Sequence, residues 1–294
     1  MKTAITKQQQ TIDQLPKGCV KPMFVFVVMT LLGKDVYKLR NEQYERRFSL
    51  STALRIGIHS CKAIQELHQC KFLSRDIKPS NYAVGLRENN QHKTIFLFDF
   101  GLARRFVDRS GKHVKSRGEV GWRGTNRYGS LNAHLRLDLS RRDDLESWFY
   151  MLVEISRGAL PWRFVKEREA AEKAKKHARG AGRCELLQKC PKQYDEILKM
   201  IDALAFEEDP DYDRIYSLFD EVRESNHIKM EDRYDWEEES EVTSSGSTVG
   251  GVQLEALLQR AHLNLEQNIA DASAKVDTKQ QQHAYVRTKE TLHA

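Results

Sequence analysis

The chain has 294 residues, of which 31% are charged and 40% are hydrophobic, and its formal net charge is +6. These values predict a soluble, mildly basic protein with enough apolar residues for a packed core. A charge of this size is weak evidence for nucleic-acid binding, and no basic cluster is paired with aromatic residues that could stack on bases. We therefore expect no nucleic-acid partner. A basic face suits acidic or phosphorylated proteins at least as well.

The cysteine pattern argues against two kinds of site. The five cysteines are odd in number, widely spaced and without a CxxC pair: Cys19, Cys61, Cys70, Cys184 and Cys190. A disulfide framework and a zinc site are therefore not expected, and the pattern fits a reducing, intracellular compartment, cytoplasmic or nuclear. Residues 1–15 lack the apolar core of a signal peptide. The apolar run at residues 23–32 is too short to span a bilayer, so we expect no membrane partner.

The N-terminal part of the chain contains one strand candidate and one helix candidate. Residues 1–22 are polar and rich in glutamine, and predict a loosely ordered segment or a short helix. Residues 23–29 are rich in β-branched and aromatic residues, which favours a buried strand. Apolar residues recur at helical spacing over residues 50–64. They predict a helix with Ser49 or Ser51 as its N-cap.

The central part combines a strand, a long loop and a core helix. Residues 93–98 predict a strand, and residues 101–130 form a basic, glycine-containing loop without hydrophobic periodicity. Residues 143–156 are apolar almost all round, which predicts a buried helix. Gly158 and Pro161 follow in the order that is typical of a helix end.

The C-terminal part predicts further helices and a linker. Residues 165–180 resemble an exposed helix, and residues 184–205 and 212–225 each fit an amphipathic helix. Residues 238–251 are acidic and then rich in serine and glycine, as in a flexible linker. Residues 252–270 have helical periodicity, and this helix packs back on the domain, frays in solution or binds a partner. The predicted parts of the chain are residues 1–22, 23–237, 238–251 and 252–294.

Two short motifs carry the chemistry of the sequence. The first is "RDIKPSN" at residues 75–81, and the second is "DFG" at residues 99–101, directly after the predicted strand at 93–98. Phosphoryl transfer from a nucleotide needs a carboxylate to orient and deprotonate the attacking hydroxyl, and a cation for the transferring group. It also needs an amide and a second carboxylate to hold magnesium. The two motifs supply all four groups in this order. The alternative is a solvated turn and an unrelated glycine turn.

With these motifs the chain resembles the eukaryotic protein kinases, and within them the casein kinase I superfamily and its tau-tubulin kinase-like group. The narrower resemblance rests on "DFGLAR" (99–104), "RGTNRYGSLNAH" (123–134), "RRDDLES" (141–147), "YMLVEISRGALPWR" (150–163) and "DPDYDRI" (209–215). It covers approximately residues 24–237. The resemblance implies an α+β, protein kinase-like fold, mainly the helical C-terminal lobe with a remnant of the N-lobe sheet and the hinge.

The resemblance also implies roles for single residues. Asp76 would be the catalytic base, and Lys78 would contact the transferred phosphate. Asn81 and Asp99 would hold Mg²⁺ against ATP, and Thr125 would bond Asp76 and Lys78, as in kinases that phosphorylate serine and threonine. The residues implied to surround adenine are Met29, Thr30, Leu31, Leu32, Ala83 and Phe98.

Three further residues match a substrate-binding anion pocket of this superfamily. Arg127, Gly158 and Lys166 would bind acidic or already phosphorylated protein substrates, with Arg127 as a bidentate phosphate ligand and Gly158 offering a free N–H. The resemblance also implies that Asp144 anchors the catalytic loop, although an ordinary carboxylate at a helix N-terminus is the alternative from sequence. Ser74 stands where kinases usually have a structural histidine, and its hydroxyl can still offer a hydrogen bond.

The small lobe of a kinase is not evident in the sequence. Residues 1–22 contain no glycine-rich loop, and neither Lys17 nor Lys21 is assigned as the lysine that binds the ATP phosphates. We therefore expect weak or no Mg-ATP binding by this chain. Two functions remain open: an active serine/threonine kinase, or a catalytically impaired kinase-like scaffold that binds protein partners.

Overall fold

The structure is a computed structural model, and it describes residues 29–237. The chain divides into two units, Met1–Glu238 and Glu239–Ala294, and every element below belongs to the first. The predictions for residues 1–22, 238–251 and 252–294 lie outside the described residues. So does the strand predicted at 23–29, apart from Met29, which is not in a strand.

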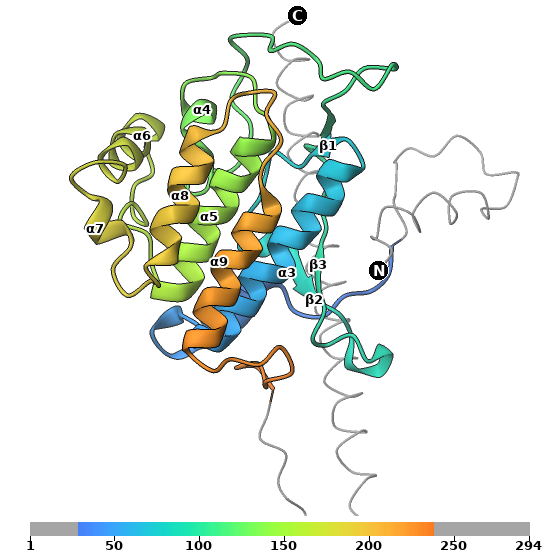
Figure 1. The fold of residues 1–294 in the computed structure, drawn as a ribbon, viewed down its shortest axis with the longest axis vertical. Coiled ribbons are helices and arrows are strands. Elements are labelled where there is room, and N and C mark those ends of the chain that lie inside the picture. The colour runs from blue at the N-terminus through green and yellow to red at the C-terminus, as the bar shows by residue number, and fades with distance from the viewer. Residues whose placement is uncertain (1–28, 238–294) are drawn as a thin grey trace, which may run out of the picture. The chain divides into compact units, whose positions relative to one another are not determined.

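Helices make up most of the described part of the chain (Figure 1). The α-helices are α2 Val36–Asn41, α3 Leu50–Gln69, α4 Leu131–His134, α5 Arg141–Arg157, α6 Arg168–His177, α7 Arg183–Leu186, α8 Gln193–Ala203 and α9 Tyr212–Ser225. The short 3₁₀ helices are η1 Tyr44–Arg46, η2 Pro79–Asn81 and η3 Arg87–Asn89. The strands are β1 Phe72–Leu73, β2 Tyr82–Val84, β3 Ile95–Leu97 and β4 Arg104–Arg105.

Helices α3 and α5 form the centre of the core, and α8 and α9 lie beside them (Figure 1). The side chain of Ser49 caps α3 by accepting the Thr52 N–H at 3.2 Å, which confirms the predicted cap and helix. Almost every side chain of α5 is buried, as predicted from its apolar sequence. The indole of Trp148 donates to Ser60 Oγ at 2.9 Å and ties α5 to α3. Burial of this apolar surface is the main stabilising term of the fold.

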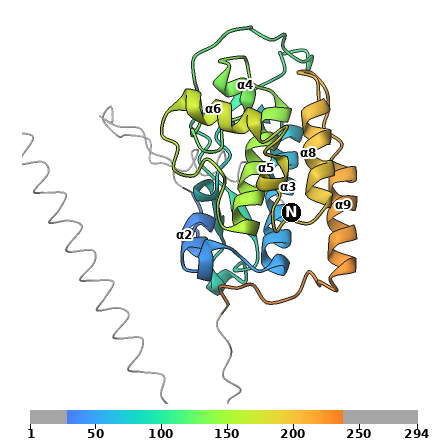
Figure 2. The same cartoon turned by 90° about the vertical axis from the view of Figure 1, so that its left-hand side faces the viewer.

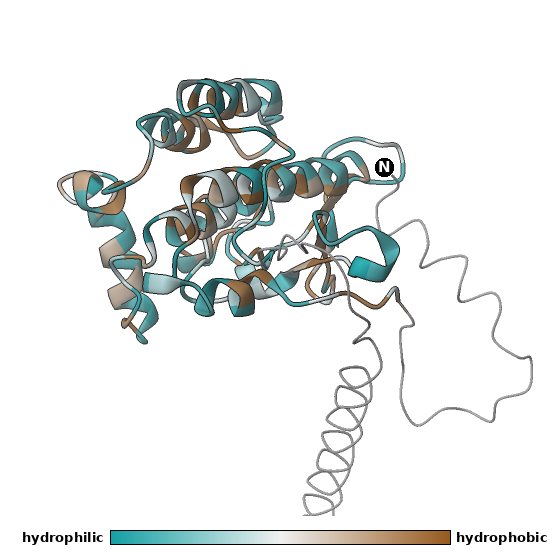
Figure 3. Cartoon of the chain, turned by 90° about the horizontal axis from the view of Figure 1, so that it is seen from below, coloured by the Kyte–Doolittle hydropathy of each residue, from teal (hydrophilic) through white to brown (hydrophobic). Residues whose placement is uncertain are grey.

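Amphipathic helices cover this core. In Figure 3, hydrophobic and hydrophilic residues lie on different sides of these helices. Helix α9 follows the prediction for residues 212–225 and buries Ile215, Leu218 and Phe219. Figure 2 shows α6 beside α4, and α2 at the opposite end of this unit.

Two small antiparallel sheets position the loops between them. β1 pairs with β4, with Leu73 opposite Arg104, and β2 pairs with β3, with Ala83 opposite Phe96. The strand predicted at 93–98 is thus confirmed as β3. Among residues 29–237, no helix is long and apolar enough to cross a bilayer.

Three features differ from the sequence prediction. Residues 184–205 are not one helix, because Lys189 has φ +66°, a conformation that no helix interior accepts, and Pro191 follows it. Helix α6 is not simply exposed, since Ala171 and Lys175 are fully buried. The short helix α2 was not predicted. The side chain of Asp35 caps it.

Candidate active site

The two loops that carry the predicted chemistry lie side by side. Residues 74–81 connect β1 to β2 through η2, and residues 99–101 follow β3 and lead to β4. The Phe98 N–H donates to the Asn81 carbonyl oxygen at 3.0 Å, which continues the β2–β3 pairing. Asn81 and Asp99 therefore lie at the same edge of this sheet.

The predicted catalytic side chains form one connected cluster. Asp76 Oδ2 accepts from Lys78 Nζ at 2.6 Å, and Asp76 Oδ1 accepts from Thr125 Oγ1 at 2.8 Å. Lys78 Nζ also lies 3.4 Å from Thr125 Oγ1. Gly124 allows this approach: it has φ +97°, and a Cβ there would lie 3.0 Å from the Arg75 carbonyl oxygen. A carboxylate, an ammonium and a hydroxyl from two distant segments thus converge.

The residues predicted to hold magnesium fit that ion. Asn81 Nδ2 donates to the Asp76 carbonyl oxygen at 2.9 Å, which leaves Asn81 Oδ1 available as a ligand. Asp99 is exposed, has φ +63°, and accepts the Gly101 N–H at 3.2 Å. Within residues 29–237 no group of three or more His, Cys, Asp or Glu side chains could hold a metal. A site of one carboxylate and one amide suits Mg²⁺, which keeps waters and takes phosphate oxygens as its other ligands.

Asp144 fixes the start of the catalytic loop from within the core. Its carboxylate accepts the N–H groups of Ser74 at 2.7 Å and Arg75 at 2.8 Å. His68 Nε2 lies 3.0 Å from Asp144 Oδ2, and His68 Nδ1 lies 2.5 Å from the Tyr212 hydroxyl. Asp144 is buried, and its contacts confirm the anchoring role over the simple helix-terminus interpretation.

The side chain of Ser74 takes no part in this network. Ser74 is 1% exposed, and its hydroxyl has no hydrogen-bond partner among the described residues. The expectation that this hydroxyl offers a hydrogen bond is therefore not met. The backbone N–H of Ser74 makes the anchoring contact instead.

Two of the residues predicted to surround adenine belong to the β2–β3 sheet region: Ala83 lies in β2, and Phe98 directly follows β3. Ala83 is 2% exposed, and Phe98 is half-buried. The Gly33 N–H donates to the Val84 carbonyl oxygen at 2.8 Å and holds the predicted hinge against β2. The backbone of residues 30–32 has no hydrogen-bond partner among residues 29–237. The hinge residues are exposed or half-buried: Met29, Thr30, Leu31 and Leu32.

Among the residues of the predicted anion pocket, Arg127 already has an ion-pair partner. Arg127 Nη1 donates to Glu154 Oε1 at 3.1 Å, and Nη2 donates to the Arg163 carbonyl oxygen at 3.1 Å. Burial would lower the pKa of Arg127, but the Glu154 carboxylate raises it and keeps the guanidinium charged. Lys166 is exposed, and its carbonyl oxygen accepts from Asn126 Nδ2 at 2.9 Å.

The expectation of a free N–H at Gly158 is wrong. This N–H donates to the Glu154 carbonyl oxygen at 2.9 Å, because Gly158 ends α5 in a left-handed conformation with φ +97°. A Cβ at this position would lie 2.7 Å from the Glu45 carbonyl oxygen. The small size of Gly158 therefore allows the close approach of the Glu45 carbonyl oxygen, and its N–H is not available as a donor.

Comparison with known proteins identifies the domain type. The family model for protein tyrosine and serine/threonine kinases matches residues 2–219. The chain belongs to the protein kinase family. The matched range begins before residue 23, and the domain boundaries proposed from sequence remain predictions.

Two curated relatives are serine/threonine kinases. A probable serine/threonine-protein kinase of Dictyostelium discoideum is 38% identical over 223 residues, which are 76% of this chain and 44% of that protein. Serine/threonine-protein kinase spe-6 of Caenorhabditis elegans is 33% identical over 261 residues, which are 87% of this chain and 65% of that protein. The chain thus spans between about half and two thirds of these relatives. The predicted kinase-like α+β fold is confirmed.

A buried carboxylate that the sequence did not single out ties the activation segment, the basic loop of residues 101–130, to the loop before α5. Asp138 accepts from Arg104 Nη1 at 2.8 Å and from Arg117 Nη2 at 2.7 Å. Burial would raise the pKa of Asp138, but hydrogen bonds from Arg117 and Arg104 hold it well below its usual range. Arg75 is also close to these arginines. Burial and neighbouring arginines, Arg123 first, lower its pKa.

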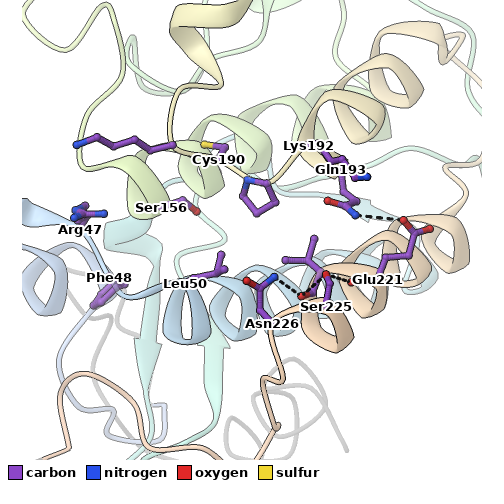
Figure 4. A pocket seen from close by; sticks show the side chains of 13 residues that line it. Arg47, Phe48, Leu50, Ser156, Cys190, Lys192, Gln193, Glu221, Ser225 and Asn226 are labelled. Carbon is purple, nitrogen blue, oxygen red and sulfur yellow. Dashed lines mark hydrogen bonds between the residues drawn. The ribbon is translucent and has the colours of Figure 1, made fainter.

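One cavity in the described part of the kinase domain is separate from the predicted site. It has a volume of about 670 Å³ and lies between the first turn of α3, the end of α5, α8 and the last turns of α9 (Figure 4). Phe48, Leu50, Ser156 and Cys190 are among its lining residues, and Gln193 Nε2 donates to Glu221 Oε2 at 3.4 Å across its rim. None of the predicted site residues lines it.

Proposed function

We propose that the protein transfers the γ-phosphate of Mg-ATP to serine and threonine residues of proteins. The observation that carries this proposal is the cluster of Asp76, Lys78 and Thr125, in which the three polar groups are within 3.4 Å of one another. The serine/threonine kinase relatives support the same reaction class.

In this proposal each side chain acts at a defined atom. Asp76 accepts the proton of the substrate hydroxyl and orients it, and the Lys78 ammonium stabilises charge on the transferring group. Thr125 holds Asp76 in place through its 2.8 Å hydrogen bond. Asn81 and Asp99 are the ligands that would hold Mg²⁺, and the ion supplies charge neutralisation at the phosphates.

ATP would bind along β2 and the hinge. The apolar surface of Ala83 and Phe98 would meet the adenine ring, with Met29 as the gatekeeper. The backbone of Thr30 to Leu32 would provide its hydrogen-bond partners. The unpaired backbone of residues 30–32 within the described part of the chain supports this assignment.

For the substrate we propose acidic or phospho-primed serine and threonine sites. The exposed cation of Lys166 and the half-exposed guanidinium of Arg127 lie on neighbouring segments and support an anion-binding pocket. Membership in the casein kinase I-like and tau-tubulin kinase-like group is part of the proposal and rests on motifs such as "RRDDLES" (141–147). We also propose an intracellular location, where ATP is the abundant phosphate donor.

The scaffold function is not favoured, because the predicted catalytic residues of the helical lobe are present and hydrogen-bonded to one another: Asp76, Lys78, Asn81 and Thr125. The test uses the full chain, Mg-ATP and a pair of acidic peptides that differ only in one phosphoserine. Mass spectrometry should find new phosphate on serine or threonine, with faster transfer to the primed peptide. Arg127→Ala should weaken transfer to the primed peptide more than to the unprimed one. If neither peptide is phosphorylated and Mg-ATP does not raise the melting temperature, the scaffold function replaces this proposal.

A further inference from the structure

One lysine of the kinase domain is entirely enclosed. Lys175 lies on α6, where eight of ten residues are not buried, yet its own exposure is 0%. A buried ammonium is costly unless hydrogen bonds and charges compensate it. The groups around the Lys175 ammonium therefore indicate its role.

The Lys175 ammonium closes a turn of the activation segment. Nζ donates to the carbonyl oxygens of Asn126 at 2.8 Å and Gly129 at 2.6 Å, and lies 3.0 Å from His134 Nε2. The turn is also closed from inside, because the Thr125 carbonyl oxygen accepts the Gly129 N–H at 2.8 Å. Lys175 on α6 thus binds two carbonyl oxygens of the turn of residues 125–129.

Both proposed functions of that turn depend on its geometry. Thr125, at its start, bonds Asp76 at 2.8 Å. Arg127, in its middle, points its guanidinium to Glu154 at 3.1 Å. A shift of the Asn126 and Gly129 carbonyls would therefore move both the group that holds the catalytic base and the proposed anion ligand.

We propose that Lys175 is a positioning residue for phosphoryl transfer, which holds the turn of residues 125–129 in the conformation that places Thr125 on Asp76 and Arg127 in the substrate pocket. This inference rests on the proposed kinase function. Lys175 touches neither nucleotide nor peptide in this proposal. It acts through the turn.

The charge of Lys175 is poised to change near neutral pH. Burial lowers its pKa to about 7, with the Glu146 carboxylate of α5 raising it and Arg179 lowering it. His134 of α4 faces it as a neutral ring, because burial and then Lys175 lower its pKa to about 4. The rings of Tyr150 and Trp162 lie 5.1 and 5.6 Å from Nζ. The charged amine has three N–H groups for three acceptors, whereas the neutral amine has two. The turn of residues 125–129 should therefore become less ordered as the pH rises above this pKa.

The test compares Lys175→Met with Lys176→Met in the full chain. Lys176 is the next residue, its side chain is 53% exposed, and within residues 29–237 its ammonium pairs only with Glu172 on the same helix. Lys175→Met should lower kcat for primed and unprimed peptides by roughly 10–100-fold, the size expected for loss of charge-assisted hydrogen bonds. Lys176→Met should leave kcat unchanged. The wild-type kcat should fall above the Lys175 pKa, and this decline should be absent in Lys175→Met.

Amide hydrogen exchange separates this inference from the proposed function. The Tyr128 and Gly129 amides should exchange roughly 10–100-fold faster in Lys175→Met, while the amides of α3 and α5 keep their protection. Should the wild type phosphorylate no peptide, the kinase proposal fails and this exchange pattern still decides the role of Lys175. Exchange and kcat equal to those of Lys176→Met would overturn the inference. If Lys175→Met does not fold, the role of Lys175 is tested by the pH dependence of amide exchange at Gly129 in the wild type. Protection of this amide that does not change with pH, after correction for intrinsic exchange, would overturn the inference.

Discussion

At the residue scale, the catalytic loop is held by its backbone. Ser74 and Arg75 present their N–H groups to Asp144 at 2.7 and 2.8 Å, and Asp76 follows directly. A carboxylate that accepts two backbone N–H groups and faces His68 is a strong fixed acceptor in the core. The loop therefore depends on the Asp144 carboxylate and on the backbone of Ser74, and not on the Ser74 side chain.

Ser74→Ala tests whether the loop depends on the backbone of Ser74 and not on its side chain. The Ser74 hydroxyl is buried without a partner among the described residues, so its removal should not destabilise the protein. We expect the free energy of unfolding to stay equal or to rise by about 1 kcal/mol, because an unpaired buried polar group is lost. Urea unfolding measures it, and kcat should not change. A loss of more than about 1 kcal/mol would mean that the hydroxyl has a partner.

At the element scale, the activation segment is connected to the helical lobe by charges. Arg104 follows the DFG motif and Arg117 lies further along the segment, and both donate to Asp138 on the loop before α5. An arginine pair around a buried carboxylate orders the segment with no added phosphate in the contact.

Asp138→Asn should loosen this connection. Breaking the cluster leaves two arginines without their carboxylate, and we expect a loss of about 1–3 kcal/mol in stability and faster proteolysis within residues 104–118. The folded pKa of Asp138 lies below its ordinary value of 3.8, so its contribution is present above that pH and is lost as the pH falls further. The stability difference between wild type and variant should be full at pH 6 and shrink below about pH 4.

The matched control is Asp220→Asn on α9. Asp220 is also paired with an arginine, Arg223, but its side chain is 55% exposed. This substitution should change stability by less than about 0.5 kcal/mol. Equal effects of the two substitutions would contradict the role given to Asp138.

At the scale of the whole molecule, charge is distributed unevenly over the chain. The net charge is +6, and residues 104–127 contain eight lysines and arginines. Such a segment beside the catalytic loop should steer acidic substrates towards it.

This field predicts a salt effect on KM. With an acidic peptide, raising the salt concentration from about 50 to about 500 mM should increase KM several-fold, because the Debye length falls to a few ångströms. With a neutral peptide KM should change little, and kcat should change little for both. The same salt response for both peptides would show that the basic segment does not select the substrate.

Sequence predicted the parts of the fold that depend on local pattern. The core helix ending at Gly158 and helix α9 were expected because their hydrophobic period and end signals are contained in the segments themselves. The break in residues 184–205 was missed, because the left-handed backbone at Lys189 has no glycine to signal it. The site residues that belong to a local motif were likewise predicted. Asp76, Lys78 and Asn81 stand within one motif and were predicted.

The residues that hold the site were harder to predict. Lys175 binds carbonyls 46 and 49 positions away, and Asp138 binds arginines 21 and 34 positions away. In sequence, a lysine among lysines and glutamates is typical of an exposed helix, and its burial is decided only by the packing of α6 on the activation segment. The free N–H expected at Gly158 failed for a similar reason. The glycine that ends a helix uses its N–H for that end.

The role of Asp76 as the catalytic base is tested by the rate of phosphoryl transfer by Asp76→Asn, compared with wild type at saturating Mg-ATP and acidic peptide. Asparagine keeps the size of the side chain and can still accept from Thr125, but it cannot take the proton of the substrate hydroxyl. We expect kcat to fall by roughly 10²–10⁴-fold while the melting temperature is retained. A variant that transfers phosphate at the wild-type rate would contradict the assignment of Asp76 as the base and the proposed kinase mechanism with it.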